Sequence, residues 1–293
     1  MFGLGLLGTV AVHRMLAEMT APPPIPADPQ RIVSLAPSVT ETLYAIGLGD
    51  RVVGVTQYCR FPPEAREKPM VAGFSDVNYE AVLRQRPDLV ALPVDKIRNR
   101  ENLERLGLSV LPLNTRSLHG LLEAVDRLGQ ATGRPAEAEA IIGRINGAIR
   151  EARARAAGRP RPRVLFSVMH SYQGLGYITE INAVGRDGFF SEMIEIAGGQ
   201  NVYQGALSFP RLSREAIIFL NPEVIIDVIP FTEDLEAVRR DWYSLTAVEA
   251  VKNDRVIFLT DEADTVPGPR MDRTLGKISR ALHPSESPTS IEQ

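Results

Sequence analysis

One stretch of this sequence occurs twice. The first copy runs from Asn78 to Val90, and the second runs from Ser213 to Ile225, 135 residues later. In each copy a glutamate, Glu80 or Glu215, starts an apolar helical run, and a proline follows it by seven residues. An acidic residue and the pattern of a buried strand come next. A repeat of this length predicts two similar lobes with a cleft between them and the two glutamates at equivalent points.

Strands alternate with helices around the two copies. Apolar runs predict strands at 32–36, 52–55, 89–92, 110–113, 163–168, 224–226 and 256–259. Helices are expected at 78–85, 99–106, 118–132, 135–157, 213–220 and 271–282, with another from 187 to a glycine pair at 198–199. The helix after the first strand should have Ser38 as its N-cap and Glu41 completing a capping box, and it should end at Gly47. This alternation favours parallel sheets wrapped by helices.

The segment from Pro135 to Ala157 is rich in Ala, Glu and Arg, and Ile141, Ile145 and Ile149 fall on one helical face. Read as one helix, it would be about 35 Å long, enough to span two lobes. We therefore expect an α/β fold with two doubly wound parallel-sheet lobes, 31–132 and 160–283. A single long helix within 133–159 should join them, the ligand cleft should lie between them, and 284–293 should be a disordered tail.

Composition and motifs exclude several classes of protein. The formal net charge is −3 and no run of Lys or Arg occurs, which disfavours nucleic acid as a partner. Cys59 is the only cysteine, so an intramolecular disulfide and a cysteine-based zinc site are both excluded. The sequence has no G-x-S-x-G, H-E-x-x-H or Walker A pattern. We expect a protein that is not an enzyme and has no catalytic cofactor, and a two-lobed α/β enzyme is the alternative.

Residues 1–30 differ from the rest of the chain. Phe2–Val12 is a short apolar run, too short to span a bilayer as a helix. It resembles the apolar core of a secretion signal, although no Lys or Arg precedes it. A stiff linker with prolines at 22–24 and 26 follows. Two interpretations stay open, an export or anchor segment and a disordered tail. The G-x-G-x-x-G match at 3–8 is rejected because no strand precedes it.

Four segments together resemble a known family. They are 31–41, 54–63 and the two repeat copies, and the resemblance extends over 31–282. The chain resembles the class III periplasmic solute-binding proteins, which are the receptors of ABC importers for cobalamin, ferric siderophores or haem. The sequences of 31–41 and 54–63 most resemble the cobalamin-binding branch of this family. The resemblance implies two α/β lobes joined by one rigid helix, with a bulky ligand between them. It also implies a monomer that is periplasmic or exported, with the N-terminal segment as a candidate membrane tether.

Glu80 and Glu215 have two compatible interpretations. Each carboxylate follows a capping residue, Asn78 or Ser213, and a helix dipole stabilises an acidic group there by about 0.3–1 kcal/mol. In the family that the chain resembles, one glutamate on each lobe pairs with arginines of the membrane permease. The resemblance therefore implies that Glu80 and Glu215 dock the protein on the permease of an ABC transporter.

The ligand should be bound by loops at the strand ends of both lobes. The candidates are Tyr58, Phe74, His170, Tyr172, Phe209 and Arg270. In the resemblance, Tyr58 matches an aromatic position that touches corrin, and Phe74 and Phe209 stand where the cobalamin branch often has Trp. The expected ligand is a corrinoid first, and a ferric siderophore or haem second.

Metal binding by the protein itself is not expected. His170 follows a buried strand and is a candidate either for iron ligation or for accepting a hydrogen bond. No set of three His and Asp residues is visible in the sequence, so capture of bare zinc or manganese is not expected. Asp261, Glu262 and Asp264 form an acidic loop that should be solvated, at the place where the family has a mobile cleft loop.

Overall fold

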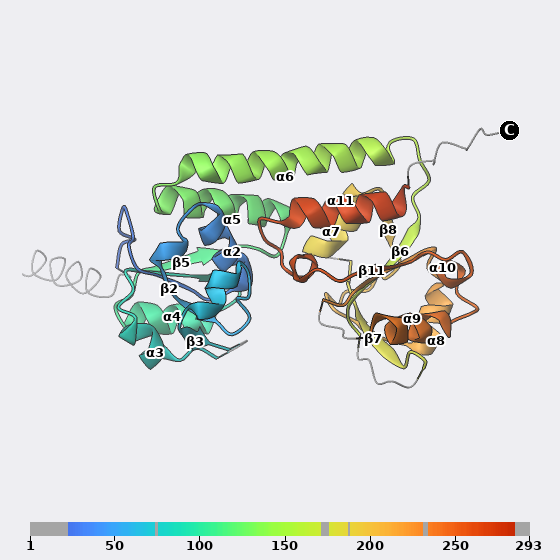
Figure 1. Ribbon diagram of the computed structural model, residues 1–293, viewed down its shortest axis with the longest axis horizontal. Helices are drawn as coiled ribbons and strands as arrows, with labels where there is room; N and C mark the ends of the chain where they lie inside the picture. The colour runs from blue at the N-terminus through green and yellow to red at the C-terminus, as the bar shows by residue number, and fades with distance from the viewer. Residues whose placement is uncertain (1–22, 74–75, 171–175, 187, 231–233, 285–293) are drawn as a thin grey trace, which may run out of the picture. The chain divides into compact units, whose positions relative to one another are not determined.

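The computed structural model describes residues 23–73, 76–170, 176–186, 188–230 and 234–284. The chain divides into two compact units, of which the first comprises 1–113 and 127–134 and the second 114–126 and 135–293. Each unit has its own sheet with helices against it (Figure 1). The predicted α/β class with parallel strands and helices is confirmed. The N-terminal run 2–12 lies outside the described residues.

The sheet of the first unit is entirely parallel. Its strands, in the order β3-β2-β1-β4-β5, are β1 (Ile32–Ser34), β2 (Val52–Thr56), β3 (Met70–Ala72), β4 (Leu89–Pro93) and β5 (Val110–Leu113). The helices in its part of the chain are α2 (Pro37–Ala45), α3 (Tyr79–Arg84), α4 (Ile97–Arg105) and the end of α5 (Leu118–Ala131), with the 3-10 turns η1 (Gly49–Arg51) and η2 (Pro63–Glu67). Val33, Val82 and Leu92 are fully buried in its core.

The sheet of the second unit is mixed. It has the order β11-β10-β6-β7-β9, and its strands are β6 (Arg163–His170), β7 (Glu180–Ala183), β8 (Gln200–Asn201), β9 (Arg211–Ser213), β10 (Val224–Val228) and β11 (Val256–Leu259). β8, β10 and β11 are parallel to their neighbours, whereas β7 pairs antiparallel with β6 and β9. The prediction of parallel sheets alone is wrong here, because the sequence interpretation missed β7 and β9, whose short segments carry polar residues.

The helices of the second unit are α6 (Pro135–Ala156), α7 (Phe189–Ile196), α8 (Arg214–Leu220), α9 (Leu235–Tyr243), α10 (Glu249–Lys252), α11 (Met271–Leu282) and the 3-10 turn η3 (Glu262–Thr265). α6 and α11 lie side by side (Figure 1). Ile141, Ile145 and Ile149 are buried on one face of α6. The continuous helix expected over 135–157 is confirmed, and its role as a bridge and the lobe boundaries drawn from the sequence stay predictions.

The ends of α2 differ in how well the sequence predicted them. The N-cap is Ala36 and Pro37 is the first helical residue, so the predicted capping box of Ser38 and Glu41 is wrong. A proline is favoured at the first helical position because its missing N–H and fixed φ suit it. Both Ser38 and Glu41 are buried. The predicted end is confirmed, since Gly47 has a φ of 80° and the Leu48 amide donates to the carbonyl of Leu43 at 2.9 Å.

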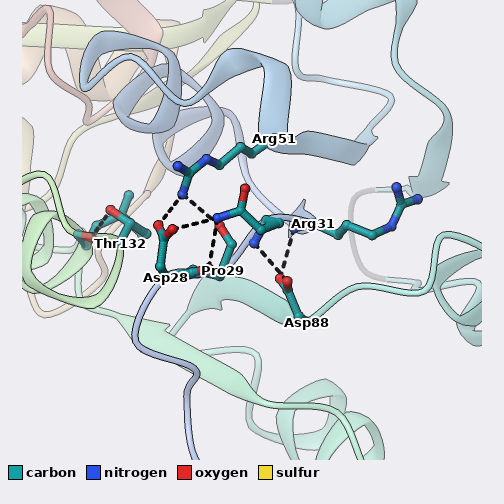
Figure 2. A network of polar contacts seen from close by, with 8 residues as sticks. Asp28, Pro29, Arg31, Arg51, Asp88 and Thr132 are labelled. Carbon is teal, nitrogen blue, oxygen red and sulfur yellow. Dashed lines mark hydrogen bonds and ion pairs between the residues drawn. The ribbon is translucent and has the colours of Figure 1, made fainter.

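The acidic residue after the proline of each repeat copy has a structural role. The carboxylate of Asp88 accepts the backbone N–H groups of Gln30 at 2.8 Å and Arg31 at 2.9 Å (Figure 2). In the second copy the carboxylate of Glu223 accepts the N–H of Arg163 at 2.8 Å. Each acidic side chain therefore fixes the start of the first strand of its unit, β1 or β6.

The side chains of Arg31 and Arg163 also bind the carbonyl groups at the ends of the two repeated helices. The guanidinium of Arg31 donates to the carbonyl of Gln85 at 2.7 Å, and the guanidinium of Arg163 donates to the carbonyl of Asn221. The residue before each proline is left-handed, with φ of 48° at Arg86 and 42° at Asn221. The repeat therefore reproduces a helix, its left-handed exit and the anchoring of a neighbouring strand.

Candidate functional site

The two repeated helices begin with matching caps. The side-chain oxygen of Asn78 accepts the N–H of Ala81 at 2.9 Å, and the hydroxyl oxygen of Ser213 accepts the N–H of Ala216 at 3.3 Å. Both predicted caps are confirmed, and each stabilises its helix by about 1 kcal/mol. The caps hold Glu80 and Glu215 in the first turns of α3 and α8.

Glu80 and Glu215 are both exposed, but their neighbours differ. The Glu80 side chain is 81% exposed and lies 3.6 Å from the guanidinium of Arg84, one helical turn along. The Glu215 carboxylate accepts a hydrogen bond of 2.8 Å from the hydroxyl of Ser213. Its own backbone N–H, followed by that hydroxyl, lowers the pKa of Glu215 below the usual value of 4.5. Glu215 therefore stays ionised in mildly acidic solution.

The outer faces of these helices also carry apolar side chains. Val82 of α3 and Ile217 of α8 are fully buried, which fixes the opposite faces toward solvent. Leu83 is 41% exposed on α3, and Ile218 is 38% exposed on α8. Phe219 of α8 is 87% exposed, the highest value among the exposed large hydrophobic side chains of the described chain.

A buried polar network supports the loop after β2. The Thr40 hydroxyl donates to the Ser34 hydroxyl at 2.7 Å and contacts the sulfur of Cys59 at 3.0 Å. The Thr56 hydroxyl lies 3.2 Å from the same sulfur. These side chains are at most 3% exposed. Together they fasten the carboxyl ends of two neighbouring parallel strands, β1 and β2, where binding loops of α/β proteins lie.

Cys59 has a structural role that the sequence does not predict, as a member of this buried polar network. Burial raises the pKa of its thiol above the usual value, so the group is a neutral partner of Thr40 and Thr56. The predicted ligand residue Tyr58 precedes it and is 42% exposed, with its backbone N–H donating to the Thr56 hydroxyl at 3.3 Å. The network thus holds an exposed aromatic side chain at the end of β2.

A pocket beside this loop is too small for a bulky ligand. It has a volume of about 210 Å³ and is lined by Val55, Thr56, Gln57, Cys59, Arg60, Ala65, Arg66 and Met70. Pockets that hold drug-sized ligands have volumes of about 300–1,000 Å³. A macrocycle therefore needs a different surface.

Phe209, the predicted aromatic ligand residue of the second unit, lies on the segment before β9 and is 58% exposed. That segment is held by backbone hydrogen bonds from Ala183 to Pro210 at 2.9 Å and from Gly185 to Ser208 at 2.7 Å. A Cβ at Gly185 would come within 1.9 Å of the carbonyl oxygen of Leu207, so only glycine allows this approach. The glycine is the sequence signal for the close contact that places Phe209.

Arg270, predicted on a ligand loop, lies at the N-cap of α11 with only 12% of its side chain exposed. Its guanidinium is 3.9 Å from the carboxylate of Asp261. The ammonium group of Lys277 lies 2.8 Å from Asp264 and 3.6 Å from Asp261, and the Thr274 hydroxyl donates to Asp264 at 2.7 Å. These contacts join η3 to α11.

The expectation of a solvated acidic loop is wrong for Asp264, which is 1% exposed. Its charge is stabilised by Lys277, which the sequence separates from it by thirteen residues. Asp261 remains 46% exposed at its side chain. The N–H of Ala263 lowers the pKa of Asp261, and the charges of Lys277 and Arg270 act in the same direction.

Three further predicted ligand residues are Phe74, Tyr172 and His170. Phe74 and Tyr172 lie outside the described residues. His170 is the last residue of β6, where its backbone pairs with Ile181 of β7. Within the described ranges, no three His, Cys, Asp or Glu side chains are grouped as metal ligands. No helix in the described part of the chain is long and apolar enough to cross a membrane.

Comparison with known proteins gives the family. The periplasmic binding protein model matches residues 32–263, across both units. The chain belongs to the periplasmic binding protein family. Its relatives include an ABC transporter substrate-binding lipoprotein of Bacillus subtilis, which is 28% identical over 89% of this chain and 82% of the relative. A vitamin B12-binding protein of Vibrio cholerae is 28% identical over 84% of this chain and 86% of the relative.

Solved structures of the family agree with the fold. The periplasmic vitamin B12-binding protein of Vibrio cholerae has a TM-score of 0.76 at 25% identity, covering 88% of this chain and 98% of that one. A periplasmic haem-binding protein of Pseudomonas aeruginosa has a TM-score of 0.75 at 25% identity, covering 89% and 95%. The family is one of binding proteins, not of enzymes.

Proposed function

We propose that this protein is the substrate-binding component of an ABC importer, and that it captures a bulky metal-containing ligand for delivery to a membrane permease. The observation that carries the proposal is the likeness to vitamin B12-binding proteins, which extends over 84% of the chain in sequence and 88% in structure. A corrinoid is therefore the first candidate ligand. The same relatives support a periplasmic or otherwise exported location.

The exposed aromatic side chains support a large, flat ligand. Tyr58 and Phe209 are 42% and 58% exposed, although each stands on a segment that hydrogen bonds hold in place. Burying one such ring against a ligand stabilises the complex by about 1–3 kcal/mol. The proposed ligand residues are these two together with Phe74, His170, Tyr172 and Arg270.

Haem or a ferric siderophore is the second candidate. The likeness to the haem-binding protein of Pseudomonas aeruginosa, at a TM-score of 0.75, is close to that of the vitamin B12-binding protein. Phe74 and Phe209 offer flat apolar faces that suit a porphyrin as well as a corrin. An iron-containing ligand would give His170 a role that a corrinoid does not require.

The permease is the proposed macromolecular partner, and Glu80 and Glu215 are the proposed docking residues. Both carboxylates are exposed on capped helices, as a charge-assisted pair with an arginine requires. Each unit carries one of them, Glu80 in the first and Glu215 in the second. The protein is proposed to act as a monomer.

The ligand assignment is tested by absorption titration. Purified protein is mixed with cyanocobalamin, haem and a ferric siderophore in parallel, and the spectral change is followed to saturation. Saturable one-to-one binding of cyanocobalamin supports the first candidate, and binding of only haem or the siderophore selects the second. Binding of none of the three contradicts the proposed ligand class.

The site is tested in the same titration with Phe209→Ala. Loss of a buried aromatic contact should weaken ligand binding by about 1–3 kcal/mol. Ile97→Ala is the matched control, because Ile97 is an apolar side chain of α4 with a similar exposure of 61%. Unchanged affinity in the Ala variants of Tyr58, Phe74 and Phe209 would place the site elsewhere.

A further inference from the structure

The outer face of α8 combines one charge with an exposed apolar surface. Glu215 and Phe219 are four residues apart and lie on one helical face, and Ile218 lies beside them. Phe219 is 87% exposed and Ile218 is 38% exposed. A phenylalanine ring held almost entirely in water gains free energy when another surface covers it, and aromatic residues are enriched in protein interfaces.

The matching face of α3 is different at one position. The same spacing gives Glu80, then Leu83, which is 41% exposed, and then Arg84. Arg84 therefore stands where the second copy has Phe219. Its guanidinium lies 3.6 Å from the Glu80 carboxylate, so the α3 face pairs its charge with an opposite charge. The two faces share a glutamate and an exposed aliphatic side chain, and the α8 face adds the ring of Phe219.

We propose that Phe219, with Ile218 and Glu215, forms an apolar anchor that binds the membrane permease. The ring would enter an apolar pocket on the permease, beside a basic side chain that pairs with Glu215. The face of α3 would contribute mainly the charge contact of Glu80. This inference rests on the proposed function, and it adds an unequal division of binding energy between the two docking faces.

Two observations favour the permease as the occupant over a second copy of this chain. The glutamate and the aliphatic residue recur on both units at one spacing, which fits a partner with two similar binding surfaces. A symmetric contact between two copies of the α8 face would bring Glu215 toward Glu215, and like charges in an interface are unfavourable. A permease that presents basic groups beside an apolar pocket avoids this repulsion between like charges.

The two docking faces should affect different rate constants. Exposed charges mainly raise the association rate, and their effect falls as salt rises. A buried aromatic side chain mainly slows dissociation. Glu80→Ala should therefore slow association and reduce its salt dependence, whereas Phe219→Ala should speed dissociation with little change in the salt dependence.

The experiment measures binding kinetics to a permease. The probe is the ABC permease–ATPase complex of the same organism that binds the wild-type protein, reconstituted in nanodiscs on a sensor surface. Wild type, Phe219→Ala, Phe219→Leu and Glu80→Ala are compared, with Ile97→Ala as the control for loss of an exposed apolar side chain outside the two faces. Affinity for the transported ligand and the oligomeric state are measured on the same preparations.

Phe219→Ala should dissociate at least about tenfold faster than wild type, as expected for an interface hot spot. Phe219→Leu should recover part of the loss, and Ile97→Ala should resemble wild type. Dissociation of Phe219→Ala within twofold of wild type would overturn the inference. So would a wild-type dimer that Phe219→Ala converts to monomers, because the ring would then bind a second copy. If the wild-type protein binds no permease at all, the proposed function itself fails.

Discussion

The segments that contain α3 and α8 share the contacts that fix their backbones and differ in a side chain that they expose. Both have a side-chain cap, a left-handed residue before proline and an acidic side chain that holds a neighbouring strand. These features satisfy backbone N–H groups or fix backbone turns. At one exposed position the two copies carry different chemistry, with Arg84 in the first and Phe219 in the second. The shared contacts stabilise the same backbone conformation in both copies, and the exposed position carries the difference in docking that we infer.

The loops that carry the candidate ligand residues are also supported differently. In the first unit, hydroxyls and a thiol join β1 to the loop that carries Tyr58. In the second unit, η3 is joined to α11 and Arg270 by charged side chains. The first arrangement consists of neutral groups, whereas the second consists of charged groups.

The largest stability effect should come from the ionic support of the second unit. Lys277→Met leaves the carboxylate of Asp264, whose side chain is fully buried, without its counter-charge. We expect a loss of about 2–4 kcal/mol in the free energy of unfolding, because an uncompensated buried charge is strongly unfavourable. Arg84→Met is the control, since it breaks a surface pair worth at most about 1 kcal/mol. Equal losses in the free energy of unfolding for Lys277→Met and Arg84→Met, measured by urea unfolding, would contradict the expected difference between the buried and the surface pair.

Removal of the caps should affect the two copies equally. Asn78→Ala and Ser213→Ala each remove the acceptor of one helix N–H, and each should lower the free energy of unfolding by about 0.5–2 kcal/mol. Thermal or urea unfolding measures both. A loss confined to one variant would show that the two helices are not equivalent.

The contribution of Glu215 to the stability of the folded protein should depend on pH. Because folding lowers its pKa below 4.5, its contribution to stability is present above the unfolded pKa and is lost as the pH falls through the folded value. Ser213→Ala removes the hydroxyl that contributes to the shift, so the pKa of Glu215 should move back toward 4.5. NMR titration of the glutamate carboxyls measures it. An unchanged pKa in the variant would assign the shift to the backbone N–H alone.

The smallest effect concerns Cys59 in the neutral network of the first unit. The thiol is 3% exposed and burial raises its pKa, so iodoacetamide should modify it slowly at pH values near 8. Unfolding in urea should restore the rate of an ordinary thiol. Mass spectrometry follows the reaction. Equal rates in the folded and unfolded protein would remove Cys59 from the buried network.

The sequence predicted those parts of the structure that local patterns determine. The strands from β1 to β11 with continuous apolar runs, the long helix α6 and the caps Asn78 and Ser213 follow from periodicity and side-chain chemistry. β7 and β9 were missed because they are short and carry polar residues, so neither shows a continuous apolar run. The burial of Asp264 depends on Lys277 of another element, and the role of Cys59 depends on Thr40 and Thr56. Such contacts have no signature in a local pattern.

The most direct test of permease docking by the repeated glutamates compares ligand delivery by wild type and by Glu80→Ala/Glu215→Ala through the permease in proteoliposomes. The two carboxylates are exposed, so their removal should leave the fold and the affinity for the ligand unchanged. Uptake through the permease should be largely abolished in the double variant. A double variant that binds the permease and delivers ligand as the wild type does would contradict the docking role of the repeated glutamates.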